Sequence, residues 1–151
     1  MQELDGPLNA FLIMPRYGYN LEQLAENCGN KFSRETILDL GQRLVKLFEV
    51  IHGAGFVYND LKLDNIMIGL NDKFRPAAGE SSLKDCTIHL IDFGYCTKFL
   101  SKGNHISQEV LEIFRGNMMF CSIHQMNFKT TSRRDDLISL CYLLSYLLNG
   151  G

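Results

Sequence analysis

The strongest hydrophobic pattern in the chain predicts a long amphipathic helix after Ser33. Apolar side chains recur there at intervals of three and four residues, which places them on one face of a helix. These positions are Ile37, Leu40, Leu44, Leu47, Phe48 and Ile51. Ser33 is a favourable N-cap, and Gly53 and Gly55 are expected to end the helix because glycine readily adopts the conformations found at helix C-termini.

Two further segments have helical patterns. Asn20 can cap a short helix that ends at Gly29. Its apolar face comprises Leu21, Leu24 and Ala25. Ser132 precedes a segment at residues 133–148 that is apolar on nearly every side after Asp136. A helix with that pattern is expected in the centre of a domain.

Short apolar runs predict the strands. Residues 11–14 are continuously apolar and are expected to form a buried strand that enters a turn at residues 15–18. Residues 56–57, 66–70 and 87–91 are expected to form further strands. The chain is therefore predicted to combine helices with short strands.

Two long segments lack a regular pattern. Residues 71–85 are too long and too polar for a tight hairpin turn, so we expect an exposed and mobile insertion between two strands. No hydrophobic period persists between Gly94 and Thr131. We expect an irregular segment there, with at most one short helix around residues 108–114.

Composition limits the classes of protein that the chain can represent. Its 151 residues suffice for one domain or part of one, and 46% hydrophobic with 21% charged residues is typical of globular proteins. A formal net charge of −2 gives no general attraction to nucleic acid or anionic membranes. The longest apolar stretch, residues 137–148, is too short to cross a bilayer. We therefore expect neither nucleic acid nor a membrane as a partner.

The cysteines indicate a reducing compartment. All five are widely spaced, and none forms a C-x-x-C pair. The first residues contain no basic region and no apolar segment of signal-peptide length. Reduced thiols in an intracellular protein, cytoplasmic or nuclear, are the expected interpretation.

The candidate chemistry lies in two motifs that follow predicted strands. Asp60, Lys62 and Asn65 occur in the order D-L-K-x-x-N, and Asp92 begins the sequence D-F-G. Phosphoryl transfer requires an oriented hydroxyl, Mg²⁺ held between phosphate oxygens, and compensation of charge on the transferred group. Asp60 would orient the hydroxyl and Lys62 would contact the transferred phosphate, as the catalytic residues. Asn65 and Asp92 would supply the hard oxygen ligands that Mg²⁺ prefers.

The sequence S-R-R-D-D-L at residues 132–137 resembles the start of the central helix in the casein kinase I family of serine/threonine kinases. Residues 21–33 resemble that family's segment between the hinge and its long helix, and residues 122–123 stand where the family has S-I-N. The resemblance covers residues 9–151 apart from 71–85. It implies an α+β, protein kinase-like fold: mostly the helical C-terminal lobe with the hinge strand, truncated at both ends.

The resemblance also implies how the chain divides. Residues 1–18 would supply the last strands of the N-terminal lobe and the hinge. Residues 19–151 would form the C-terminal lobe through its central helix, with an inserted loop at residues 71–85. Asp136 would hydrogen-bond the backbone of the loop that carries Asp60 and fix its geometry.

The same resemblance implies ATP and Mg²⁺ as cofactors and a binding site for adenine. Met14 would lie beside the adenine as gatekeeper, and the Pro15 carbonyl and Tyr17 amide would be its backbone hydrogen-bond partners. Met67 and Ile91 would form the apolar floor and back wall. For Met14, Met67 and Ile91 the hydrophobic pattern alone favours plain core packing.

The sequence departs from the family pattern at several positions. Tyr58 and Asn59 replace the first two residues of the usual H-R-D, so the arginine that contacts a phosphate on the activation segment in many kinases is absent. Control by such a phosphate is therefore not expected. Met119 occupies the place of an arginine linked to acidic or phosphorylated substrates, and methionine does not bind anions. A preference for substrates that are already phosphorylated is accordingly not expected.

The 151 residues contain neither a G-x-G-x-x-G loop nor a V-A-I-K lysine. We therefore expect a fragment of a casein kinase I-like kinase that acts on Ser and Thr of proteins, with the missing N-terminal lobe of its parent chain as a further partner. The isolated chain is expected to lack turnover because half of the positioning groups are missing.

Two alternatives remain open. One is an inactive, pseudokinase-like interaction module, and the other is a small-molecule kinase, which Lys62 and the S-R-R-D-D-L sequence disfavour.

Overall fold

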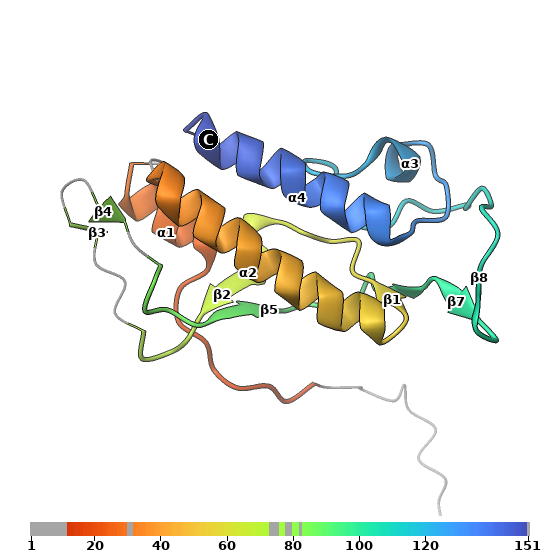
Figure 1. Cartoon of the computed structure of the whole chain (residues 1–151), viewed down its shortest axis with the longest axis horizontal. Coiled ribbons are helices and arrows are strands. Elements are labelled where there is room, and N and C mark those ends of the chain that lie inside the picture. Colours follow the sequence, from red (N-terminus) through yellow and green to blue (C-terminus); the bar gives the residue numbers. More distant parts are fainter. Residues whose placement is uncertain (1–11, 30–31, 73–75, 78–79, 82, 151) are drawn as a thin grey trace, which may run out of the picture.

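The computed structural model describes residues 12–29, 32–72, 76–77, 80–81 and 83–150. The helices in these ranges are α1 (Leu21–Asn27), α2 (Arg34–Gly53), the 3₁₀ helix η1 (Leu63–Asn65), α3 (Ile123–Met126) and α4 (Arg133–Leu148). The strands are β1 (Phe56–Val57), β2 (Ile66–Ile68), β3 (Pro76–Ala77), β4 (Glu80–Ser81), β5 (Ile88–Leu90), β6 (Thr97–Lys98), β7 (Leu100–Ser101) and β8 (Asn104–His105). Figure 1 shows α2 and α4 side by side and antiparallel, with β2 and β5 on the other side of α2.

The two helices predicted in the first third of the chain are confirmed, and local hydrogen bonds explain where they begin. Asn20 Oδ1 accepts a hydrogen bond from Gln23 N at 2.8 Å, and Gln23 Oε1 accepts one from Asn20 N at 3.1 Å. Ser33 Oγ accepts a hydrogen bond from Thr36 N at 3.2 Å and so caps α2. These caps satisfy N–H groups that the first turn of a helix leaves without backbone partners.

The hydrophobic core lies largely where α2 packs against α4. The buried apolar residues of the two helices are Ile37, Leu40, Leu44, Phe48, Leu140, Leu143 and Leu147. Gly41 permits a close approach of the helices, because a Cβ at this position would lie 2.9 Å from Leu144 Cδ1. Burial of each large apolar side chain contributes roughly 1.5–3 kcal/mol. This contact fixes α2 and thereby the loop that follows it.

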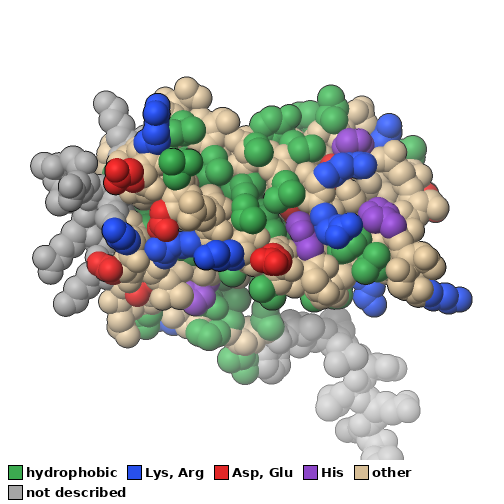
Figure 2. Space-filling model, in the orientation of Figure 1, with side chains coloured by type: hydrophobic (Ala, Val, Ile, Leu, Met, Phe, Trp, Pro, Cys, Tyr) green, Lys and Arg blue, Asp and Glu red, His purple; other side chains and the backbone are tan. Residues whose placement is uncertain are grey.

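Helix α4 has the predicted bounds, but it is not enclosed on nearly every side in the described part of the chain. Figure 2 shows hydrophobic side chains gathered over α2 and α4 on the face that it displays. The exposed large apolar residues of these helices are Leu38, Val45, Val50, Leu137, Tyr142 and Leu148. The expected central position is therefore wrong for Leu137, Tyr142 and Leu148, which the packing of α2 and β1 on α4 leaves exposed. No helix in the described ranges is both long and apolar enough to cross a membrane.

The strands pair antiparallel, two at a time. β2 pairs with β5 in a register that places Met67 opposite His89, and β1 pairs with β6. The strands expected at residues 66–70 and 87–91 are confirmed in shorter form, and the strand at residues 56–57 is confirmed as predicted.

The buried strand predicted at residues 11–14 is wrong where it can be judged. Phe11 lies outside the described residues, and Leu12 and Ile13, which belong to no strand, are 80% and 85% exposed. A strand requires a hydrogen-bonding neighbour. In this part of the chain the first such contact comes only where Gly18 N donates to Ile68 O at 2.9 Å.

The segment expected to be an exposed insertion is partly anchored to the core. Leu83 is 1% exposed and belongs to the main hydrophobic cluster, and β3 pairs with β4. Arg43 also donates to the carbonyl oxygens of Lys84 and Cys86 at 3.1 and 2.6 Å. Residues 73–75, 78–79 and 82 lie outside the described residues. The expectation of a wholly exposed insertion is therefore wrong.

The segment between the D-F-G motif and α4 is largely irregular, as expected, and residues 108–114, where at most one short helix was expected, form none. Leu111 N donates to Phe128 O at 2.6 Å, and Val110 forms an antiparallel bridge with Lys129. These backbone groups bond to a distant part of the chain and not within a helical turn. The short helix of this segment is α3.

Candidate active site

The loop between β1 and η1 carries Asp60 and is held by α4. The Asp136 carboxylate, 1% exposed, accepts hydrogen bonds from the backbone N–H groups of Tyr58 and Asn59, each at 2.8 Å. His52 Nε2 lies 2.7 Å from the same carboxylate. The predicted contact between Asp136 and the loop backbone is thus confirmed. Because α4 packs on α2, this contact positions Asp60 relative to the core.

Three of the predicted residues meet at one carboxylate. Lys62 Nζ lies 3.3 Å from Asp60 Oδ2. Asn65 Nδ2 donates to the same oxygen at 2.9 Å and to Asp60 O at 3.0 Å. Asp60 is 1% exposed, and a buried carboxylate is costly unless charged or hydrogen-bonding partners compensate it. Lys62 and Asn65 supply that compensation, while the Lys62 side chain remains 34% exposed.

Asn117 also belongs to this site, although the sequence pattern did not predict it. Its Nδ2 donates to Leu61 O at 2.8 Å and lies 3.4 Å from Asp60 Oδ1. Its Oδ1 accepts a hydrogen bond from Phe120 N at 3.0 Å. Asn117 is 57 residues from Asp60 in a segment without periodicity, so the single sequence carries no signal for this contact.

Strand β5 brings Asp92 to the same loop. Ile91 N donates to Asn65 O at 3.0 Å, so Asp92 directly follows a residue that is bonded to the loop. Asp92 is exposed, has φ of 57°, and accepts a hydrogen bond from Gly94 N at 3.2 Å. This left-handed conformation is uncommon outside glycine and often marks functional turns. The Asp92 carboxylate is therefore accessible to solvent next to the loop.

Tyr58 connects the two motifs. Its hydroxyl donates to Ile91 O, and its ring meets the Phe93 ring edge-on with centroids 5.5 Å apart. Burial, supported by the nearby Asp60 charge, raises the pKa of Tyr58 well above its usual range. The hydroxyl therefore stays protonated and remains a hydrogen-bond donor.

Asn65 and Asp92 fit a divalent cation that is bound together with phosphate. Amide and carboxylate oxygens are hard ligands, and Mg²⁺ often takes only one or two protein ligands besides water and phosphate oxygens. Within the described ranges, no group of three or more His, Cys, Asp or Glu residues is placed to hold a metal ion.

Comparison with known proteins agrees with this geometry. A family model described as a protein kinase domain matches residues 7–151. The chain belongs to the protein kinase domain family. Within this family it is similar to proteins named as casein kinase I homologues.

Two of these relatives illustrate the similarity. Casein kinase I homolog 1 of Saccharomyces cerevisiae is 31% identical over 145 residues, which cover 95% of this chain and 25% of the relative. A probable casein kinase I homolog of Encephalitozoon cuniculi is 33% identical over 138 residues, which cover 91% of this chain and 39% of the relative. The chain therefore spans well under half of the length of each.

The kinase residues expected beside adenine are only partly brought together. The Tyr17 ring lies 4.7 Å from the His89 ring, and Met67 is paired with His89 across β2 and β5. Met14 and Pro15 are exposed, and Met14 retains 45% of its accessible surface. Tyr17 and Met67 thus share one sheet surface, whereas Met14 and Pro15 remain exposed in the described chain.

Cys96, two residues after the D-F-G motif of this kinase chain, is expected to resist alkylation. All five cysteines are free thiols, as expected, and burial raises the pKa of Cys96 to about 12. The thiolate is the reactive form, so iodoacetamide at pH 8 should modify Cys96 at least about tenfold more slowly than an ordinary exposed thiol. Peptide mass spectrometry measures the rate, with the protein unfolded in urea as control. Equal rates in folded and unfolded protein would contradict the prediction.

Proposed function

We propose that the full-length protein is a serine/threonine protein kinase of the casein kinase I type, which transfers the γ-phosphoryl group of ATP to protein hydroxyls. The observation that carries this proposal is the convergence of Lys62 and Asn65 on one oxygen of Asp60. Together with Asp92 these residues match the requirements of phosphoryl transfer. The names of the relatives support the substrate class but belong to those proteins.

We propose a role for each of these residues in the reaction. Asp60 Oδ2 is occupied by Lys62 and Asn65, whereas among the residues that the structure describes Oδ1 has only the long contact to Asn117. Oδ1 is therefore the oxygen that would take the proton from a substrate hydroxyl as the hydroxyl oxygen bonds to the γ-phosphorus and ADP leaves. We propose that Lys62 contacts the transferred phosphate, since its side chain is partly exposed.

The cofactors of the proposed reaction are ATP and Mg²⁺. Asn65 and Asp92 would hold Mg²⁺, which compensates phosphate charge when bound. Met14, Pro15, Tyr17, Met67 and Ile91 are the residues that we propose to contact adenine. Met119, two residues after Asn117, is 69% exposed and offers an apolar surface, so we propose unphosphorylated Ser/Thr substrates.

The proposal is tested by phosphate transfer from radiolabelled ATP with the full-length protein. Casein is offered beside an aminoglycoside and choline, and label is expected on casein alone. Label on the small molecules alone would replace this proposal by a small-molecule kinase. Absence of any transfer, with no thermal stabilisation by Mg²⁺ and ATP, would instead favour an interaction module that has lost catalysis.

Asp92→Ala is expected to weaken binding of the Mg²⁺–ATP complex. Loss of one carboxylate ligand should raise the dissociation constant about 10- to 100-fold in the presence of Mg²⁺. With EDTA the variant and the wild type should bind ATP alike, because Asp92 acts through the cation. Calorimetric titration with and without Mg²⁺ measures both values. Asp85→Ala, an exposed position away from the site, is the control.

A further inference from the structure

Asn59, which directly precedes Asp60, has an unusual backbone conformation. Its φ is 69° and the residue is 3% exposed. A left-handed backbone is uncommon outside glycine, although asparagine tolerates it better than most residues, and it persists where surrounding contacts fix it. One such contact is the hydrogen bond from Asn59 N to Asp136. The side chain and the backbone carbonyl supply further contacts.

The Asn59 carboxamide connects the catalytic loop to both ends of the segment between D-F-G and α4. Its Nδ2 donates to Tyr95 O at 2.8 Å and to Thr97 Oγ1 at 2.9 Å. Its Oδ1 accepts a hydrogen bond from Thr131 Oγ1 at 2.6 Å. Both N–H groups and the oxygen of the carboxamide are therefore used.

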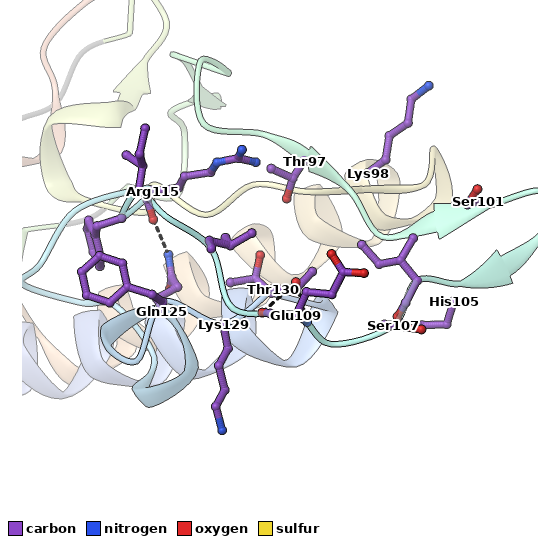
Figure 3. A pocket seen from close by; sticks show the side chains of 16 residues that line it. Thr97, Lys98, Ser101, His105, Ser107, Glu109, Arg115, Gln125, Lys129 and Thr130 are labelled. Carbon is purple, nitrogen blue, oxygen red and sulfur yellow. Dashed lines mark hydrogen bonds between the residues drawn. The ribbon is translucent and has the colours of Figure 1, made fainter.

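Gln125 connects Asn59 to Arg115, which lies in the middle of that segment. Its Nε2 donates to Asn59 O at 2.9 Å and to Arg115 O at 3.1 Å. Figure 3 shows Gln125 beside Arg115, with Thr97 across the cavity of about 530 Å³ that these residues line with Thr131. We call Asn59, Thr97, Gln125 and Thr131 the Asn59 network.

The packing at Gly116 shows how tightly this segment lies on the catalytic loop. A Cβ on Gly116 would lie 2.3 Å from Asn59 O, and the residue has φ of 109°. The next residue is Asn117, which bonds Leu61 O and approaches Asp60 Oδ1. The contacts of Asn59 thus determine where Asn117 stands relative to the oxygen that would receive the proton.

All side chains of the Asn59 network are uncharged, and the hydrogen bonds among them require no bound anion. A buried polar network whose members are satisfied restricts its surroundings to one arrangement. We infer that Asn59 is a positioning residue. Its network holds residues 115–117 against the catalytic loop and so places Asn117 beside Asp60. The hydrogen bonds that hold this segment come from uncharged side chains. The expected effect on phosphate transfer rests on the proposed kinase function. The expected effect on the position of residues 115–117 rests on the hydrogen bonds alone.

The test uses Asn59→Gly in the full-length protein. Glycine accepts the left-handed backbone without strain, so this change removes the carboxamide and leaves the backbone conformation accessible. Hydrogen exchange measured by mass spectrometry should be at least tenfold faster in peptides covering residues 112–121, and unchanged in peptides from α2. The kcat for phosphate transfer should fall about 10- to 100-fold with the KM for ATP changed less than about twofold, because small displacements of positioned groups slow the chemical step.

Two further variants separate positioning from general destabilisation. Lys102→Gly changes another left-handed residue, which is exposed and outside the Asn59 network, and it should leave both measurements as in the wild type. Thr131→Val removes one hydrogen bond of the network and should give a smaller change of the same kind. Unchanged exchange at residues 112–121 in Asn59→Gly would overturn the inference. Equal acceleration of exchange throughout the protein would do the same, since it indicates a merely structural role.

The two measurements also keep this inference apart from the proposed function. If the wild-type protein transfers no phosphate, the proposed function fails, and exchange at residues 112–121 still decides whether Asn59 holds the segment. If the wild type is active and Asn59→Gly retains its kcat, the positioning role fails while the kinase function stands.

Discussion

Replacing Asp60 by alanine is expected to reduce phosphate transfer by the full-length protein about a thousandfold. A positioned general base typically contributes a factor of about 10² to 10⁴. Asp60 is the residue whose Oδ1 is placed to take the hydroxyl proton, and its side chain also orders Lys62 and Asn65. Binding of Mg²⁺–ATP should weaken far less than transfer does, because Asp60 is itself neither a proposed nucleotide ligand nor a proposed metal ligand and its carboxylate touches the proposed metal ligand Asn65 by one hydrogen bond. Initial rates and calorimetric titration measure the two effects.

The alanine variant also leaves a donor of Asn65 without its buried partner, so Asp60→Asn is included as a variant of equal volume. Both variants should lose transfer to a similar extent, whereas Asp39→Asn, at a half-exposed residue of α2, should keep it. Turnover by Asp60→Asn within tenfold of the wild type would remove Asp60 from the role of base and point to orientation by another group.

Asp136→Ala should give the largest loss of local structure. The change leaves the N–H groups of Tyr58 and Asn59 and the His52 side chain without their common buried acceptor. Each buried donor that is left without its acceptor costs about 1–3 kcal/mol. The catalytic loop should therefore open far more often than in the wild type. Hydrogen exchange of peptides covering residues 54–63 measures this directly.

The control for this prediction is Asp39→Ala, which breaks a solvent-exposed ion pair with Arg43 at 2.8 Å. Exposed pairs of this kind contribute at most about 1 kcal/mol, so exchange at residues 54–63 should stay as in the wild type. If Asp136→Ala left the protection of these peptides within threefold of the wild type, the loop would have to be held by other contacts.

The pattern of the sequence was sufficient for the helices that position the site. α2 and α4 were predicted from hydrophobic spacing and from Ser33 and Ser132 as caps, because the hydrogen bonds of a helix and its caps join residues within a few positions of one another. The motifs that contain Asp60 and Asp92 were equally visible, since their chemistry depends on short fixed spacings.

Elements that depend on distant partners were predicted less well. Residues 12–14 have the composition of a strand but form none, and the helix expected at residues 108–114 is replaced by pairing with residues 128–130. In both places the backbone hydrogen bonds depend on segments that are remote in sequence. Local preference does not report whether such a partner is present.

The sequence by itself determined which residues carry the candidate chemistry and which helices support them. The tertiary structure alone decided how the Asp60 carboxylate is compensated and which of its oxygens has, within the described ranges, only a long contact to Asn117. It also decided that Asn59 connects the catalytic loop to a segment up to 72 residues away. The physical reason is burial: a polar side chain removed from water takes its partners from whichever segments the fold brings beside it, and those segments are set by packing of the whole chain.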